Sequence, residues 1–244
     1  MKIGVFAYNI PHKKTFEGLM NLLIHDIPIE CILATNPVKL DFYQSQVRIS
    51  PKGLVYPHPN KIAARFNIPY TVVPHNAPEA VDIIKHHGLD LGIILGARII
   101  KSPVIDSFKI GILNLHPGLL PENRGLDTVK WAILDSIPQG ATAHLIDARI
   151  DWGRKITSQV CEVYTDDTLL DILLRVQSVE QQLMLESVRL IESGRKFEFT
   201  TSVGKYNKAV SPEKEREMLA RFENYKQHYS AIVKPYSDWS GDSI

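Results

Sequence analysis

Short apolar runs alternate with helical patterns through the first 116 residues, and this alternation limits the chain to few folds. The runs suited to buried parallel strands are residues 2–7, 29–36, 70–73 and 91–95. The segments with helical spacing between them are residues 15–26, 61–66 and 77–87. Apolar strands that alternate with helices favour a parallel, doubly wound sheet with right-handed crossovers. We therefore predict an α/β fold.

The next apolar run ends in two polar side chains and a loop rich in proline and glycine. Residues 111–125 read GILNLHPGLLPENRG and place Asn114 and His116 at alternate positions. Alternate residues of a strand share a face, so both side chains are expected to point the same way. An Asn amide donates hydrogen bonds and a His exchanges protons near neutral pH, which suits a carbonyl that becomes an oxyanion. The alternative is a polar pair that only caps the loop.

A carboxylate partner for the histidine is expected further along the chain. Asp151 lies in the turn-like segment DWG after a strand, where a carboxylate could orient an imidazole or relay a proton. Asp147 is the rival, and an Asp before Gly is by itself an ordinary turn signal. The spacing does not choose between these carboxylates.

The second half of the chain continues with strands and longer helices. We expect a helix over residues 127–134 capped by Asp127, strands over 140–147 and 155–163, and a long helix from residue 165 to Gly194. A short strand over 197–201 and a helix opened by Ser211-Pro212 are expected to follow. This pattern divides the chain into a catalytic core, residues 1–195, and a C-terminal appendage, residues 196–244, that serves as a dimerisation or acceptor-binding arm.

The composition of the chain disfavours several classes of function. The chain has 244 residues, 44% hydrophobic content and a formal net charge of +1, so nothing in its charge favours nucleic acid. Cys31 and Cys161 lie far apart, which favours buried thiols over a metal site, and we expect no metal. The N-terminus lacks a signal peptide and no stretch is long enough to span a bilayer. We expect a cytoplasmic protein without a membrane partner.

The motifs together resemble the folate-dependent formyltransferase family over residues 1–195. The resemblance lies in NLHPGLLPxxRG, in GATAHLID and in IDWGRKI, an order that short patterns rarely produce by accident. It implies a Rossmann-like core with a mostly parallel twisted sheet, followed here by a short C-terminal helical appendage. It also implies N10-formyltetrahydrofolate as the formyl donor and Asn114, His116 and Asp151 as the catalytic residues. Asp147 then becomes a neighbour in the folate loop, and His144 supports the catalytic loop.

The binding residues follow from the resemblance and from the ends of the strands. The resemblance places the folate against residues 95–100 and 146–151, and the residues assigned to it are Leu95, Gly96, Ala97, Arg98, Ile99, Ile146 and Asp147. Ligands of open α/β sheets bind where strands end, and the loop of residues 117–124 follows the catalytic strand. The residues assigned to the acceptor are Tyr8, Asn9, His75, Asn76, Pro117, Gly118, Asn123 and Arg124. Arg124 is about as well suited to a structural carboxylate pair.

The acceptor predicted from these motifs is the amine of a nucleotide-linked 4-amino-4,6-dideoxy sugar, in cell-surface glycan sugar biosynthesis. The HPG and NRG segments and Trp131 resemble nucleotide-sugar N-formyltransferases. Residues 7–12, AYNIPH, lack the phosphate loop of enzymes that formylate glycinamide ribonucleotide, the first alternative. The short, mixed-charge tail disfavours tRNA, and a first strand at Lys2 leaves no room for the leading domain of formyltetrahydrofolate hydrolases. A non-catalytic folate- or nucleotide-binding protein is the other alternative, and we expect a homodimer.

Overall fold

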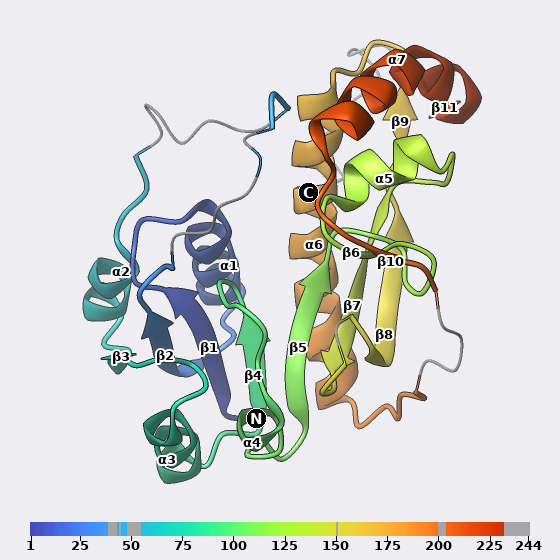
Figure 1. The fold of residues 1–244 in the computed structure, drawn as a ribbon. Helices are drawn as coiled ribbons and strands as arrows, with labels where there is room; N and C mark the ends of the chain where they lie inside the picture. Colours follow the sequence, from blue (N-terminus) through green and yellow to red (C-terminus); the bar gives the residue numbers. More distant parts are fainter. Residues whose placement is uncertain (39–42, 44, 48–54, 150, 200–203, 232–244) are drawn as a thin grey trace.

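The computed structural model describes residues 1–38, 43, 45–47, 55–149, 151–199 and 204–231, and its centre is one sheet of seven strands (Figure 1). The strands in spatial order are β3 (Tyr70–Val72), β2 (Ile29–Thr35), β1 (Ile3–Tyr8), β4 (Leu91–Ile94), β5 (Gly111–His116), β7 (Gly140–Ile146) and β8 (Gly153–Val160). The first five run parallel, whereas β7 and β8 are antiparallel to their neighbours. The predicted Rossmann-like α/β sheet, mostly parallel, is confirmed.

Helices cover both faces of this sheet. They are α1 (Lys13–Ile24), α2 (Pro59–Arg65), α3 (Pro78–His87), α4 (Ser102–Ile105), α5 (Thr128–Leu134), α6 (Leu169–Glu192) and α7 (Pro212–Tyr229). In the central strand β1, Val5 and Ala7 join the apolar cluster under α1 and α6, whereas Phe6 joins the cluster under α3 and α4. Successive strand side chains point to opposite faces, so a strand buried on both faces must be apolar throughout.

Two predicted helix boundaries coincide with caps in the structure. Gly88 ends α3 with a φ of 62°, and the Ser211 side chain accepts a hydrogen bond from the Lys214 amide at the start of α7. The long helix begins at Leu169, later than predicted. Thr168 caps it in a reciprocal capping box with Asp171. Asp167, expected inside the first turn, instead accepts hydrogen bonds from the Tyr164 amide and from Arg175.

Asp127 stands at the predicted start of α5, but it does not cap the helix. Its backbone is left-handed, with a φ of 52°, and its side chain makes no capping hydrogen bond. The carboxylate accepts a hydrogen bond of 2.9 Å from the Val210 amide instead. The prediction of a capping role was wrong because a segment far along the chain supplies a donor for this carboxylate.

The segment after α6 is bonded back onto the core. The short strands concerned are β6 (Arg124–Gly125), β9 (Val163–Tyr164), β10 (Tyr206–Asn207) and β11 (Ser230–Ala231). β10 pairs with β6, β11 pairs with β9, and Phe199 forms an isolated bridge with Arg154 where a strand over 197–201 was predicted. Residues 200–203 and 232–244, which include part of that strand and the end of the tail, lie outside the described residues. The division at residue 195 stays a prediction.

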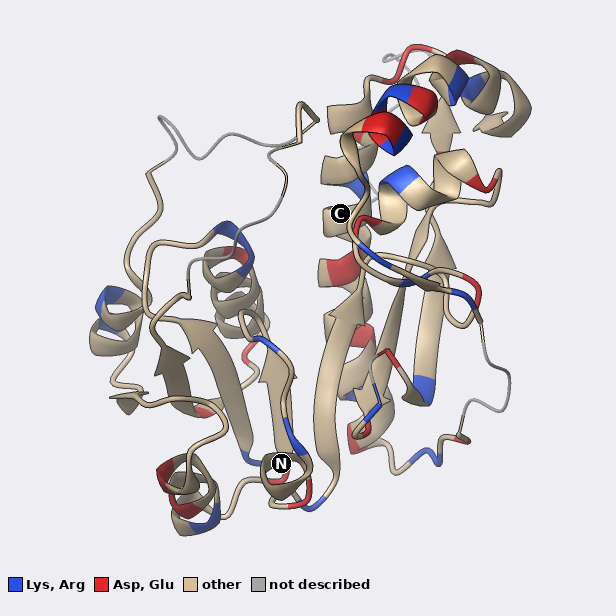
Figure 2. Cartoon of the chain, in the orientation of Figure 1, with Lys and Arg blue, Asp and Glu red and all other residues tan. Residues whose placement is uncertain are grey.

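Charged side chains of both signs are interspersed over the described chain, and α7 carries them in alternation (Figure 2). This distribution agrees with the formal net charge of +1. Among the described helices, none is both long and apolar enough to cross a membrane.

Candidate active site

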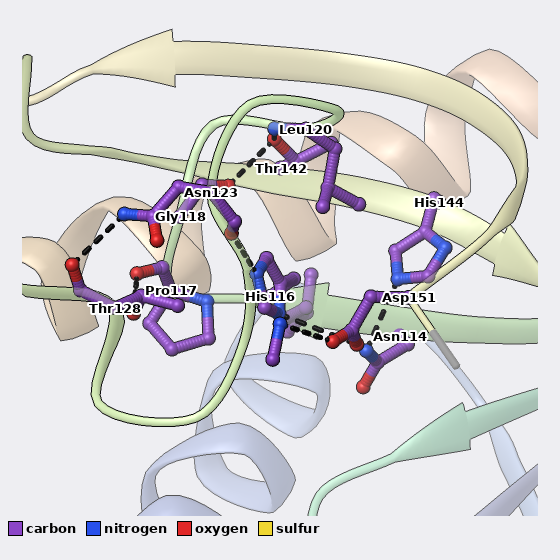
Figure 3. A network of polar contacts seen from close by, with 12 residues as sticks. Asn114, His116, Pro117, Gly118, Leu120, Asn123, Thr128, Thr142, His144 and Asp151 are labelled. Carbon is purple, nitrogen blue, oxygen red and sulfur yellow. Dashed lines mark hydrogen bonds and ion pairs between the residues drawn. The ribbon is translucent and has the colours of Figure 1, made fainter. Parts of the chain in front are cut away.

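Four polar side chains share one face of the adjacent strands β5 and β7 (Figure 3). In the antiparallel register Asn114 lies opposite His144, and His116 lies opposite Thr142. The intervening Leu113 and Leu115 are buried in the apolar core, as the alternation predicted. Cross-strand neighbours lie about 4.5–5.5 Å apart at their Cβ atoms, so the pairing gathers the polar groups into one patch.

His116 is held at both ring nitrogens. Nε2 donates a hydrogen bond of 2.7 Å to the backbone carbonyl of Asn123, and Nδ1 lies 3.4 Å from Oδ1 of Asp151. The ring is buried, with 3% of its surface exposed. A carbonyl only accepts, so Nε2 carries a proton, while Nδ1 faces the carboxylate of Asp151. The geometry therefore suits proton exchange between the imidazole and Asp151.

Asp151 joins the two loops of the site, and it is the carboxylate that reaches the histidine. While Oδ1 faces His116, Oδ2 accepts a hydrogen bond of 2.8 Å from the Gly125 amide. Its rival Asp147 is paired with the Arg149 guanidinium at 2.5 Å. Bonds from Arg149 outweigh the opposing effect of burial and hold the pKa of Asp147 below its ordinary value. The structure thus distinguishes two carboxylates that the spacing left equivalent.

His144 fixes the amide of Asn114. Its Nδ1 donates a 3.1 Å hydrogen bond to the carbonyl of Trp152, so its Nε2 is left to accept from Nδ2 of Asn114, also at 3.1 Å. Burial, with the nearby His116 as a second cause, lowers the pKa of His144 to about 4, so the ring is neutral at pH 7. One amide hydrogen of Asn114 is used in this bond. The other is available to an oxyanion.

The loop after β5 is held by buried hydrogen bonds. The Thr142 hydroxyl donates to the Gly118 carbonyl at 2.8 Å and accepts from the Leu120 amide at 3.0 Å. The side chain of Asn123 donates through Nδ2 to the Thr128 carbonyl at 2.8 Å and accepts at Oδ1 from Nδ2 of Asn207 at 3.1 Å. The Thr128 hydroxyl in turn donates to the carbonyl of Pro117. These contacts place the carbonyl of Asn123 against His116.

Two of these supporting residues were missed by the sequence reasoning. Thr142 stands two positions before His144 in the GATAH segment, so strand alternation could have placed it on the same face. Asn207 lies in β10, 84 positions from its partner Asn123, and no local pattern indicates that contact. The predicted acceptor residues Pro117, Gly118 and Asn123 take part in the same loop network.

The residues assigned to folate lie in two places. Ile146 and Asp147 line a hollow of about 530 Å³ between α4, the start of β5 and the end of β7. Leu95, Gly96, Ala97, Arg98 and Ile99 follow β4 and are not among its lining residues. Two polar contacts shape this second segment, because Tyr8 donates to the Ala97 carbonyl at 2.9 Å and Asn76 donates to the Ile99 carbonyl at 2.9 Å.

The remaining acceptor candidates lie where other strands end. Asn9 donates to Asn36 and accepts from the Tyr70 hydroxyl, both within 2.9 Å. His75 is buried, donates toward the Leu33 carbonyl at 3.0 Å, and has its pKa lowered by burial. Arg124 lies over the Trp152 ring, with the guanidinium carbon 5.0 Å from the ring centroid. Their contact with a substrate stays a prediction.

A second hollow, of about 470 Å³, lies beside the loop after β5. Its lining residues include Lys14 of α1, Glu180 of α6, Pro117 and Thr128. Lys14 pairs with Glu180 at 2.8 Å and also donates to the carbonyl of Leu115, next to His116, at 3.0 Å. Within the described ranges, His, Cys, Asp and Glu form no group of three or more that could hold a metal ion.

Comparison with known proteins identifies the class to which this site belongs. The sequence profile of a family described as formyl transferase matches residues 4–188, and the chain belongs to that family. The methionyl-tRNA formyltransferase of Chlorobium chlorochromatii is 27% identical over 151 residues, which are 61% of this chain and 48% of that protein. The chain spans about half or less of the length of the curated relatives it matches.

Solved structures show the same fold. A sugar N-formyltransferase from a Shewanella species has a TM-score of 0.62 at 18% identity, over 91% of this chain and 87% of that one. A phosphoribosylglycinamide formyltransferase from Anaplasma phagocytophilum has a TM-score of 0.63 at 20% identity, over 85% and 98%. Proteins named for different acceptors are thus equally similar, so the fold does not choose the acceptor.

Proposed function

We propose that the protein is an enzyme that transfers a formyl group from N10-formyltetrahydrofolate to the amine of a nucleotide-linked amino sugar of the 4-amino-4,6-dideoxy type. The observation that carries this proposal is the patch formed by Asn114, His116 and Asp151, in which a neutral amide and an imidazole in contact with a carboxylate lie on one strand face. Such donors stabilise the charge that develops on a formyl oxygen under attack.

The chain's own groups supply the proton steps of this reaction. The folate provides a formyl carbon that an amine can attack. The free amide hydrogen of Asn114 donates to the oxygen of that carbon as it becomes an oxyanion. For His116 to donate to the same oxygen, one of its ring nitrogens exchanges its present partner, the Asn123 carbonyl or Asp151, for that oxygen. Asp151 receives the proton that the amine loses. The proton then passes to the leaving nitrogen of the folate, so the amine gains the formyl group and tetrahydrofolate departs.

The hollow beside α4 fits the donor. Phe108, Ile105 and Leu145 give it apolar walls, while Asp147 and Ser102 place polar atoms at its edge. A flat pterin ring needs this combination of apolar surface and a few hydrogen-bonding groups. Ile146 and Asp147 would then bind the folate, with residues 95–99 on the neighbouring loop, as the sequence motifs predicted.

The hollow beside Pro117 supports a small acceptor. It adjoins the loop after β5 and presents two cations, Lys14 and Lys130, and two acids, Asp127 and Glu180. Each lysine has a carboxylate partner in this structure, Glu180 for Lys14 and Glu215 for Lys130. Cations suit a diphosphate, and a carboxylate suits a sugar hydroxyl or amine. The segment AYNIPH at residues 7–12 replaces a glycine-rich phosphate loop, which disfavours glycinamide ribonucleotide.

The direct test is incubation of the protein with N10-formyltetrahydrofolate and a panel of UDP- and dTDP-linked amino sugars. We expect one of them to gain the mass of one formyl group. Formylation of glycinamide ribonucleotide alone would replace the proposed acceptor, and no product from either class would contradict it. If folate binding survives in the variant His116→Ala but neither form turns over any substrate, the protein is a binding protein without catalysis.

The homodimer and the cytoplasmic location belong to the same proposal. Light scattering after size-exclusion chromatography should give twice the chain mass of 27.6 kDa. A mass of one chain at micromolar concentration would contradict the dimer. Cell fractionation should place the protein with cytoplasmic enzymes, and recovery with membranes or in the medium would contradict that location.

A further inference from the structure

Residues 45–47, from the long connection between β2 and α2, contact the C-terminal helix α7 across the chain. The hydroxyl of Ser45 donates to Oε2 of Glu215 at 2.5 Å, and the amide of Gln46 donates to Oε1 of the same carboxylate at 2.9 Å. The partners are about 170 positions apart in sequence. Figure 1 shows this short blue piece of chain close to α7 and α6, away from the strand that leads into it.

Glu215 is a buried carboxylate with its oxygens fully used. Only 1% of its surface is exposed, and two further donors contact it: Nζ of Lys130 lies 2.9 Å from Oε2, and the Tyr43 hydroxyl lies 3.4 Å from Oε1. Burial raises the pKa of Glu215, but the bonds from Ser45, Lys130 and Gln46 lower it by more, so the net pKa lies below its ordinary value. The group is therefore charged at neutral pH.

Lys130 connects this carboxylate to the hollow beside Pro117. Its ammonium group also contacts the Ser45 hydroxyl, at 2.7 Å, and the Asp127 carboxylate, at 3.9 Å. Lys130, Asp127 and Val47 all line the hollow. Two lining residues thus depend on Glu215: Lys130 bonds to it directly, and Val47 follows Ser45 and Gln46, which bond to it. Glu215 itself is not a lining residue.

We infer that Glu215 is a positioning residue for the acceptor: it holds residues 45–47 and Lys130 in the wall of the pocket and so sets how tightly a nucleoside diphosphate group binds there. This inference rests on the proposed function, since it assigns the pocket to the acceptor. Because Glu215 belongs to the C-terminal appendage, the appendage would help to bind the acceptor of the core. A purely stabilising role is a weaker account, because a buried ion pair often adds no net stability over apolar residues of the same size.

The first experiment needs no ligand. Amide hydrogen exchange at Gln46 and Val47 is measured by NMR in the wild type, in Glu215→Ala and in the control Glu217→Ala. Glu217 lies on the same helix, pairs with Lys214 and Arg221, and has no contact with residues 45–47. We expect exchange at Gln46 to accelerate about tenfold or more in Glu215→Ala, since its acceptor is lost, and to be unchanged in Glu217→Ala.

The second experiment measures binding with defined probes. Isothermal titration calorimetry with UDP and with dTDP should show the affinity of the nucleotide that binds falling about tenfold in Glu215→Ala, with Glu217→Ala unchanged. Binding of 5-formyltetrahydrofolate should stay within about twofold in both variants, because its hollow lies elsewhere. In turnover, KM for the amino sugar should rise while kcat and KM for the folate stay the same.

Two further variants separate position from folding. Ser45→Ala removes one donor to Glu215 and leaves the pair of Glu215 and Lys130 intact. If Glu215→Ala does not fold, this variant still tests whether the position of residues 45–47 affects nucleotide binding. Glu215→Gln keeps an acceptor for the Gln46 amide and should recover part of the affinity.

Unchanged exchange at Gln46, or equal nucleotide affinity in wild type and in both Glu215→Ala and Ser45→Ala, would overturn the inference. A wild type that binds neither UDP nor dTDP would overturn the proposed acceptor class instead.

Discussion

Two loops meet at the catalytic patch, and they are held in different ways. The loop of residues 117–127, after β5, is fixed by buried side chains, of which Asn123 and Asn207 each expose 2% and Thr142 none. The loop of residues 147–152, after β7, contains an ion pair of Asp147 with Arg149, whose side chain is 59% exposed. Asp151 belongs to the second loop and bonds to the first.

The difference indicates a division of roles. Buried hydrogen bonds define one geometry, since breaking any of them leaves a polar group without water. An exposed pair contributes little and adapts to what binds beside it. We expect the first loop to hold the ring of His116 in one geometry, whereas the exposed pair of Asp147 and Arg149 constrains its own side chains less.

The largest change in rate is expected when the imidazole of His116, which the loop of residues 117–127 holds, is removed. His116→Ala should lower kcat about 10²- to 10⁴-fold, because the proton donor beside the formyl oxygen is lost. The expected change in KM for folate is small, since His116 does not line the donor hollow. Steady-state rates with the formylated sugar as product check both values. A variant with more than a tenth of the wild-type kcat would remove His116 from the mechanism.

The second prediction concerns how the free energy of unfolding depends on pH through His144. This residue of β7 bonds to the carbonyl of Trp152, in the loop of residues 147–152. Its folded-state pKa of about 4 lies below the ordinary histidine value of 6.5, so between these values the unfolded chain binds a proton that the folded chain does not. The free energy of unfolding should therefore fall by up to about 3 kcal/mol as pH drops through this window.

Urea unfolding at pH 7 and at pH 4.5 measures this change in the wild type and in His144→Gln. The variant should lose less free energy between the two pH values than the wild type. An equal loss in both would mean that His144 does not titrate in this window. At pH 7 the variant should also have a lower kcat, since Asn114 loses its partner.

Crowding the rigid loop should have the third effect. A Cβ atom at Gly118 would lie 2.7 Å from the carbonyl oxygen of Asn123 and 3.0 Å from Nε2 of His116. Gly118→Ala must therefore shift the Asn123 carbonyl that holds His116, and we expect the imidazole to move with it; displacement by about 1 Å can cost about 10² in rate. Glu122→Ala, at an exposed position of the same loop, is the control. Equal rates in both variants would show that this loop is not rigid.

The smallest effect is expected from the exposed pair of the other loop. Arg149→Ala removes the bonds to Asp147 and a guanidinium 4.5 Å from the centroid of Trp152. KM for folate should rise a few-fold, with the melting temperature unchanged, because the pair is exposed to solvent. Arg195→Ala, at an exposed position away from the site, is the control. A large loss of stability would mean that both loops are rigid.

Much of the fold and the core of the site follows from local pattern. Apolar alternation places Leu113 and Leu115 in the core and Asn114 and His116 on the other face, because strand side chains alternate whatever the strand pairs with. Helix ends were predicted where the capping residue acts within its own turn, as Gly88 and Ser211 do. The start of α6 was misplaced because Asp167 bonds to Arg175 instead.

The sequence by itself determined the strand and helix order, the pair Asn114 and His116, and the motifs that place the chain among formyltransferases. Only the tertiary structure decided that Asp151 and not Asp147 reaches the histidine, that His144 accepts from Asn114, and that Asn207 and Glu215 bond back to the core. The reason is the separation in sequence between the groups involved. Hydrophobic periodicity and helix capping depend on residues that lie within a few positions of one another. The contacts named above join residues far apart in sequence, which only strand pairing and helix packing bring together.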